Sequence, residues 1–337
     1  MARSMVWKAR IGAVAALATL LLVMTSHADA RTTAAADVRY LQAAGVLVMP
    51  FDVTSGRVSF QIVSRMGGSF GGLPVRTHWV YYAADCRHLA DVFISLTALD
   101  TVVVDPTHLQ GQTQTQDPLE NHPEGPTVDL SGERGVVIVT AFDPAGAIVP
   151  QIVGGWTIAN AAIGTSFGGD AIGVSSDGSL PDPAVLAGGI RVPTFNPATL
   201  TSSQIIMIGL ESDGGEVHPI TRPSAALRGA HVCCSASVTD NLEVTASVPD
   251  VCFDCVEFTA ITPELADVGE HALLPDTLAL ASVGFVRLSS CQSATGGGGT
   301  ALVGTGDAEQ FLVVLHGQSV GPFGVVVTGK YSGASAF

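Results

Sequence analysis

The chain has 337 residues, of which 47% are hydrophobic, and its 30 acidic against 15 basic side chains give a formal net charge of −15. A chain with this length and apolar content can bury one large core or two ordinary ones, which excludes an intrinsically disordered protein. Because a surface this negative repels phosphate groups, we expect neither nucleic acid nor anionic lipid as a partner.

The first 30 residues have the order of a secretory signal peptide. Arg3, Lys8 and Arg10 precede an apolar run over 11–24, and Ala28-Asp29-Ala30 follows as an A-x-A cleavage site. The apolar run is about 14 residues long, short of the roughly 20 that span a bilayer. We therefore predict that residues 1–30 are removed and that the mature chain, 31–337, is exported to the periplasm, the cell surface or the extracellular space without a transmembrane segment.

Short runs of apolar, β-branched and aromatic residues, separated by turns rich in Gly, Pro, Asp and Ser, predict β-strands along the mature chain. They are expected at 46–49, 58–63, 75–82, 92–96, 101–105, 135–142, 156–158, 203–210, 278–288, 311–315 and 324–329. A capped helical turn is expected at 262–269, with Thr262 as N-cap and Gly269 as stop. This spacing predicts an all-β, antiparallel β-sandwich or jelly-roll-like fold, either one large sandwich or two packed ones, with short helical turns.

The strand expected at 75–82 carries the most distinctive side chains. Its alternation places Arg76, His78 and Tyr82 on one face and Trp79 and Tyr81 on the other. With His88 and Asp91, which follow shortly after Cys86, we predict that these five residues line a groove for a glycan or another small ligand, or contribute a histidine to a metal site. The alternative is an edge or surface strand whose aromatic residues pack locally and whose histidine is satisfied by a neighbour.

Two long loops interrupt the strands. The loop over 110–134 contains carboxylates that are candidate Ca²⁺ ligands, although no EF-hand spacing is present and a solvated acidic loop is the alternative; they are Asp117, Glu120, Glu124, Asp129 and Glu133. No other cofactor is expected. The loop over 211–229 is the candidate boundary, within 211–230, between an N-terminal sandwich and a cysteine-containing C-terminal β unit. The alternative is that the mature chain forms a single undivided domain.

Residues 231–255 contain the clearest hairpin of the chain. Val232, Cys234, Ala236 and Val238 alternate with polar or small residues, and the same pattern recurs over 242–248. A three-residue loop, 239–241, would pair Val238 with Leu242 and keep both apolar sets on one face. Pro249 is expected to end the second strand.

An even number of cysteines in an exported chain predicts three disulfides among Cys86, Cys233, Cys234, Cys252, Cys255 and Cys291. Adjacent residues on a strand point to opposite faces, so Cys234 should face the core and Cys233 should face outward. We expect these two to pair with Cys252 and Cys255, which leaves Cys86 for Cys291. A tetrahedral zinc site and a redox Cys-x-x-Cys are the alternatives, but the spacing and the missing βαβ context disfavour both, so no metal site is predicted.

The chain contains three G-x-S-x-G sequences, at 67–71, 164–168 and 317–321, and no helical pattern follows any of them. No catalytic residue is therefore predicted. The sequence favours an exported, disulfide-stabilised β-sandwich protein with a non-catalytic binding or structural role, whose partner is a glycan or a cell-envelope component. The alternative is a secreted hydrolase of polysaccharides or esters, with Ser166 or a pair of carboxylates as its catalytic centre.

Overall fold

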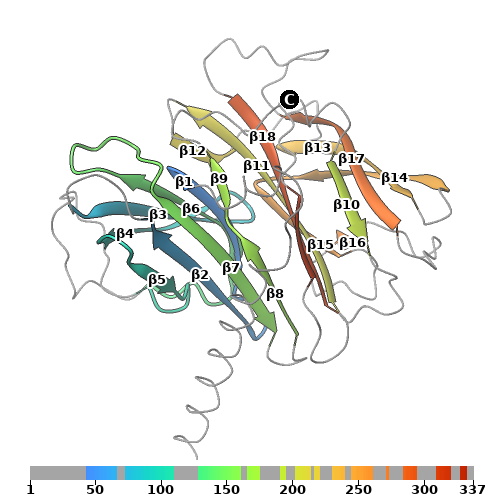
Figure 1. Ribbon diagram of the computed structural model, residues 1–337. Helices are drawn as coiled ribbons and strands as arrows, with labels where there is room; N and C mark the ends of the chain where they lie inside the picture. Colours follow the sequence, from blue (N-terminus) through green and yellow to red (C-terminus); the bar gives the residue numbers. More distant parts are fainter. Residues whose placement is uncertain are drawn as a thin grey trace, which may run out of the picture. The chain divides into compact units, whose positions relative to one another are not determined.

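The computed structural model describes the part of the chain that follows the predicted signal peptide, with gaps (Figure 1). The described residues are 43–66, 73–109, 128–160, 165–174, 190–194, 202–213, 216–220, 230–239, 244–260, 271–272, 284–293, 309–319 and 327–331. All of them belong to one compact unit. The predicted signal peptide, the predicted helical turn at 262–269 and most of the predicted loop at 110–134 lie outside these ranges. No helix in the described part is long and apolar enough to cross a membrane.

The described residues are all-β, as the sequence predicts, and every pairing between their strands is antiparallel except that of β15 with β16. The strands are β1 (Val46–Asp52), β2 (Arg57–Arg65), β3 (Val75–Ala83), β4 (His88–Leu96), β5 (Thr101–Val104), β6 (Arg134–Phe142), β7 (Ile152–Asn160), β8 (Thr165–Asp170), β9 (Ile172–Val174), β10 (Ile190–Thr194), β11 (Ser202–Asp213), β12 (Glu216–Pro219), β13 (Val232–Thr239), β14 (Thr245–Phe253), β15 (Val256–Ala260), β16 (His271–Ala272), β17 (Gly284–Ser293), β18 (Glu309–Ser319) and β19 (Val327–Tyr331).

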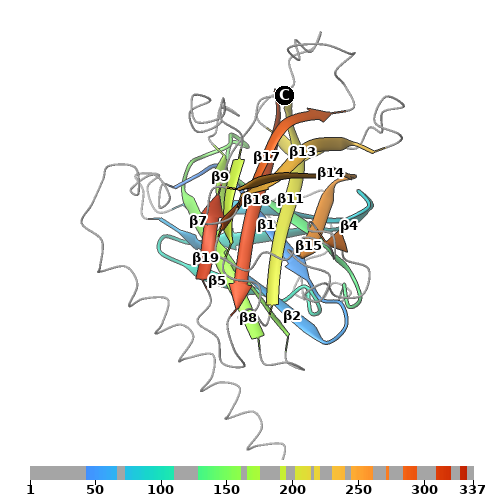
Figure 2. The same cartoon turned by 90° about the vertical axis from the view of Figure 1, so that its right-hand side faces the viewer.

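These strands form four sheets. The first sheet has the order β5-β2-β7-β8, and the second has the order β4-β3-β6-β1-β9. The third sheet has the order β16-β15-β11-β18-β19, with β12 added to β11, and Figure 2 shows β15, β11, β18 and β19 side by side. The fourth sheet has the order β10-β17-β13-β14.

The third sheet contributes to two hydrophobic cores at once. Along β11, Ile206 and Ile208 belong to the core that the first and second sheets also fill, whereas Ile205 and Met207 belong to the core shared with the fourth sheet. Successive side chains of a strand point to opposite faces, so a fully apolar run of this kind indicates a strand buried on both sides. The face-to-face packing of sheets confirms the predicted sandwich architecture.

The hairpin of β13 and β14 differs from the prediction in its register. Thr239 lies opposite Thr245, and their hydroxyl oxygens are 2.8 Å apart, so residues 240–244 separate the strands. The predicted pairing of Val238 with Leu242 is therefore wrong, because Val238 lies opposite Ala246. Both registers keep the same apolar residues on one face, so the alternation alone does not distinguish them.

Pro249 does not end the second strand of this hairpin. β14 continues through it to Phe253, and the pairing with β13 shifts by one residue between Cys234 and Ala236. A bulge interrupts the ladder of hydrogen bonds, which is where a strand tolerates a residue without an N–H group. The same kind of correction applies to β11, which continues to Asp213 and pairs with β12 where a loop was expected.

The six cysteines form three disulfides, as predicted. Cys234 is buried in the core and Cys233 points outward, which confirms the predicted faces. Cys233 pairs with Cys252, one of the two partners expected for it. The expectation that Cys234 pairs with Cys252 or Cys255 is wrong, and so is the pair Cys86–Cys291. The reason is that β17 lies on the far side of β13 and brings Cys291 to Cys234, which leaves Cys255 to pair with Cys86.

Candidate functional site

One face of β3 belongs to the core. Trp79 and Tyr81 are fully buried, so neither reaches the surface where the sequence places a binding groove. The indole Nε1–H of Trp79 donates a 2.8 Å hydrogen bond to Thr77 Oγ1, and Tyr81 packs edge-on against Phe51 with ring centroids 5.5 Å apart. Burial raises the pKa of Tyr81 well above its ordinary value of 10.0, and the carboxylate of Asp105 adds to the shift.

The other face of β3, together with β4, carries an array of aromatic and charged side chains that we call the β3–β4 face; its residues are Arg76, His78, Tyr82, His88, Asp91 and Phe93. The ring of His78 stacks on Phe93 with centroids 4.3 Å apart and an interplanar angle of 9°. The guanidinium carbon of Arg76 lies 3.9 Å from the centroid of the same phenyl ring, within the range of a cation–π interaction. Of the five predicted binding residues, the structure thus brings Arg76, His78 and Tyr82 together.

The carboxylate of Asp91 joins two histidines on the β3–β4 face. Its Oδ1 is 3.0 Å from His78 Nε2, and its Oδ2 is 3.1 Å from His88 Nε2. The side chains of His78, Asp91 and His88 are 28%, 18% and 46% exposed, so the array is within reach of a ligand from solvent. The edge of the Tyr82 ring approaches His88 at 5.7 Å between centroids. Flat rings beside hydrogen-bonding groups offer both stacking and polar contacts to a ligand.

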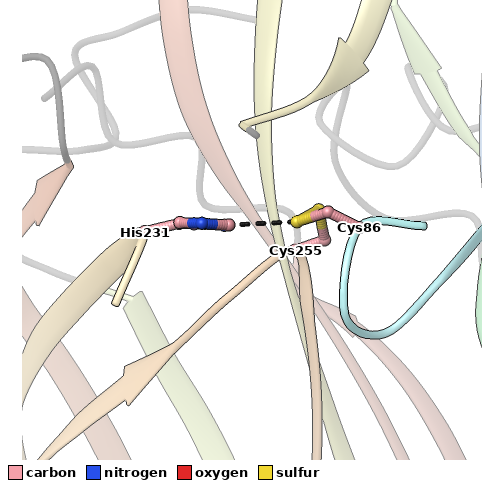
Figure 3. A group of neighbouring side chains, drawn as sticks. All are labelled: Cys86, His231 and Cys255. Carbon is pink, nitrogen blue, oxygen red and sulfur yellow. Dashed lines mark hydrogen bonds between the residues drawn. A yellow bond between two sulfur atoms is a disulfide. The ribbon is translucent and has the colours of Figure 1, made fainter. Parts of the chain in front are cut away.

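A second group of reactive side chains surrounds the Cys86–Cys255 disulfide, and we call Cys86, His231 and Cys255 the Cys86 cluster (Figure 3). His231 Nδ1 is 3.2 Å from Cys86 Sγ. A disulfide sulfur has no proton, so the ring nitrogen must be the donor in this contact. The carbonyl oxygen of Ile220 is 3.6 Å from both sulfur atoms. His231 and Cys255 are buried, and Cys86 is partly buried.

The backbone holds each residue of the Cys86 cluster in place. Cys86 lies in the turn between β3 and β4 with φ of 70°, the left-handed region that non-glycine residues adopt chiefly in turns. Its N–H donates to the carbonyl of Ala83 at 3.0 Å. Cys255 directly precedes β15, where the N–H of Val256 donates to the carbonyl of Ala84 at 3.3 Å. The cluster therefore lies where the β3–β4 turn of the second sheet meets the start of β15 in the third sheet.

His231 enters from the fourth sheet. It precedes β13, and its N–H donates to the carbonyl of Phe253 at 3.0 Å. His231 is not among the site residues predicted from the sequence, although it lies two positions before Cys233. No spacing motif connects it with Cys86, because 145 residues separate them.

The other candidate residues from the sequence are the serine of the hydrolase alternative and the carboxylates of the predicted Ca²⁺ site. Ser166 lies within β8 opposite Ala159, which is not the strand-to-helix turn that exposes a nucleophilic serine, so the hydrolase alternative gains no support there. Among the candidate Ca²⁺ ligands, hydrogen bonds from Ser131 hold the pKa of Asp129 below its usual value, and Glu133 accepts a 3.0 Å hydrogen bond from Arg87. Asp117, Glu120 and Glu124 lie outside the described residues, and the Ca²⁺ site stays a prediction.

Comparisons of the chain with protein-family models, with curated proteins and with solved structures gave no match.

Proposed function

We propose that the protein is an exported, disulfide-stabilised β-sandwich protein that binds a glycan of the cell envelope or extracellular space and performs no catalysis. The disulfides support the export part of the proposal. All six cysteines are paired, and disulfides persist in the periplasm, at cell surfaces and outside the cell, whereas the cytosol keeps thiols reduced.

The β3–β4 face is the observation that supports binding. Side chains that pack only for stability are expected to be buried, as Trp79 and Tyr81 are on the opposite face of β3. Here a stacked His78–Phe93 pair remains partly accessible beside the carboxylate of Asp91. Pyranose rings present apolar C–H faces to aromatic rings and hydroxyl groups to carboxylates and imidazoles, so a carbohydrate suits both parts of this array.

The charge of the protein narrows the class of glycan. The formal net charge is −15, and the β3–β4 face itself contains the carboxylate of Asp91, whose oxygens lie 3.0 and 3.1 Å from ring nitrogens of His78 and His88. The net charge of the protein would repel a polyanionic glycan, with screening only beyond a Debye length of about 10 Å at 0.1 M salt. The proposed ligand is therefore a neutral polysaccharide or oligosaccharide.

Retention on immobilised neutral polysaccharides tests the proposal. We expect saturable retention of the wild type and weaker retention of His78→Ala and Phe93→Ala, by about 2- to 10-fold for each lost stacking contact of roughly 0.5–1.5 kcal/mol. The matched control is His108→Ala, which removes an exposed histidine that also lies beside an aspartate, at 3.6 Å from Asp105. Thermal unfolding of each variant verifies that the fold is kept.

Two results would contradict the proposal. The first is that none of the immobilised neutral polysaccharides retains the wild-type protein. The second is equal retention of His78→Ala, Phe93→Ala and the His108→Ala control, which would remove the β3–β4 face as the binding surface.

A further inference from the structure

We infer that the Cys86 cluster is a redox-controlled metal site, in which reduction of the Cys86–Cys255 disulfide creates two thiols that bind a Zn²⁺-like divalent ion together with His231. This inference does not depend on the proposed glycan binding, because the Cys86 cluster and the β3–β4 face share no residue. In the oxidised protein the sulfur atoms are bonded to one another and the site is closed.

The distance from His231 to the nearer sulfur is already close to the value that a metal ion requires. Zinc bonds of about 2.3 Å to sulfur and about 2.0 Å to nitrogen place tetrahedral ligands roughly 3.8 Å apart for two sulfurs and roughly 3.5 Å apart for sulfur and nitrogen. Here Nδ1 of His231 is 3.2 Å from Cys86 Sγ, and the donor atoms of all three residues lie within 4.8 Å of one another. The two sulfurs are bonded to each other in the oxidised protein, so rotation of the cysteine side chains must separate them after reduction before both can bind the ion.

A fourth donor is present beside the sulfurs. The carbonyl oxygen of Ile220 lies 3.6 Å from both Cys86 Sγ and Cys255 Sγ. In the dithiol state this oxygen can accept a hydrogen bond from a thiol, and in the metal-bound state either it or a water molecule completes four ligands. Two thiolates, one neutral imidazole and one oxygen form the type of set found in zinc sites that keep an open position.

Backbone hydrogen bonds hold the residues of the cluster in addition to the sulfur–sulfur bond. Cys255 is held on one side by its carbonyl, which accepts a hydrogen bond from Gly209 N–H at 3.1 Å, and on the other by the bond between Val256 and Ala84. The Cα atoms of Cys86 and Cys255 are 5.1 Å apart. These hydrogen bonds involve no sulfur atom, so we expect them to persist on reduction of the disulfide and to keep the ligands close to one another.

The chemical steps balance with a reductant and two protons. An external dithiol donates two electrons and two protons to the disulfide, which becomes two cysteine thiols while the dithiol becomes a disulfide. A divalent ion then displaces the two thiol protons, and the resulting complex of two thiolates and one divalent cation is neutral. A buried site favours this neutral product over a pair of unpaired thiolates.

The other two disulfides offer no comparable set of ligands. Cys233–Cys252 and Cys234–Cys291 join strands of the fourth sheet. In the described ranges, the Cys86 cluster is the one group of three such side chains with metal-ligand spacing. These two disulfides therefore serve as an internal control, because their thiols are not expected to bind a metal ion after reduction.

Cobalt titration of the reduced protein tests the inference. The folded protein is treated with a phosphine, which takes oxygen from water as it reduces the disulfide and binds metal less well than a dithiol. Co²⁺ is then added, and the thiolate-to-cobalt absorption is followed in four proteins: wild type, Cys86→Ser/Cys255→Ser, His231→Ala and the control His218→Ala. His218 is a half-exposed histidine 3.4 Å from Glu211 and outside the cluster.

We expect one Co²⁺ per chain in the reduced wild type and none in the oxidised protein or in Cys86→Ser/Cys255→Ser. His231→Ala should weaken the affinity at least about tenfold, the lower limit for losing even an outer-shell partner, while His218→Ala should leave it unchanged. Equal absorption in Cys86→Ser/Cys255→Ser, equal affinity of the two histidine variants, or no binding by reduced protein would each overturn the inference. Circular dichroism is recorded in parallel, and unfolding on reduction alone would overturn it as well.

Discussion

The three disulfides should contribute very unequally to stability. Cys86–Cys255 joins residues 169 positions apart, whereas Cys233–Cys252 joins residues 19 positions apart within one hairpin. A crosslink stabilises the fold mainly by removing conformational freedom from the unfolded chain, and the effect grows with the logarithm of the closed loop. We therefore compare the variants Cys86→Ala/Cys255→Ala and Cys233→Ala/Cys252→Ala.

The loop lengths set the expected magnitudes. The chain-entropy relation gives a loss of about 5 kcal/mol in the free energy of unfolding for Cys86→Ala/Cys255→Ala and about 3 kcal/mol for Cys233→Ala/Cys252→Ala. Cys255 is fully buried and Cys252 is exposed, so lost packing adds to the first value more than to the second. The expected difference is therefore at least about 2 kcal/mol.

Urea unfolding under non-reducing conditions measures both variants, and mass spectrometry verifies that the other two disulfides are intact in each. A cost for Cys233→Ala/Cys252→Ala equal to or greater than that for Cys86→Ala/Cys255→Ala would refute the reasoning. It would mean that the link between the second and third sheets restricts the unfolded chain no more than a link across one hairpin does.

Three further substitutions test the described interactions. Trp79→Ala should lower the free energy of unfolding by about 3–5 kcal/mol, because it empties a fully buried site, and a loss below about 1 kcal/mol in urea unfolding would contradict this. Tyr81→Phe should stay within about 1 kcal/mol of wild type at neutral pH, because the hydroxyl has no hydrogen-bond partner in the described part of the chain. The raised pKa of Tyr81 means that wild-type stability falls as the pH rises above 10.0, where only the unfolded tyrosine ionises; the variant should lose less, and equal losses would refute the assignment. Hydrogen bonds from Thr97 lower the pKa of Asp100 below 3.8, so their stabilisation is present above that pH and is lost as the pH falls through the lower folded value. Thr97→Val should raise that pKa in an NMR titration, and an unchanged value would exclude the hydroxyl as a cause.

The alternation of side chains predicts the strand at 75–82 and the division of its residues between two faces. Arg76, His78 and Tyr82 share one face, and Trp79 and Tyr81 share the other, as the structure has them. The sequence does not indicate which face is buried, because both carry aromatic rings. Burial is decided by the sheets that pack on β3, and these come from distant parts of the chain.

The cysteines show the same limit more sharply. Because adjacent residues on a strand point to opposite faces, the sequence predicts that Cys233 and Cys234 have different partners, and they do. Spacing along the chain then favours Cys252 and Cys255 as the partners, because they are the nearest cysteines. This is right for Cys252, which lies opposite Cys233 in the hairpin, and wrong for Cys255. Cys234 bonds to Cys291 because β17 lies next to β13 in the sheet. The two cysteines are 57 positions apart in the sequence, so local spacing does not predict this neighbour. Once that pair exists, Cys255 is available to the β3–β4 turn.

The contact of His231 with the Cys86–Cys255 disulfide has the same origin. It requires the second, third and fourth sheets to converge at one point, and no period or motif in the sequence encodes that convergence. The candidate metal site is therefore a property of how the sheets pack. Its cobalt affinity should fall in a variant that loosens this packing without replacing a ligand, and Gly209→Ala is such a variant, since a Cβ there would lie 2.6 Å from a methyl carbon of Val232, while the hydrogen bond from the backbone N–H of residue 209 to Cys255 needs no side chain. Unchanged affinity in that variant would show that the cluster is held by its own local hydrogen bonds alone.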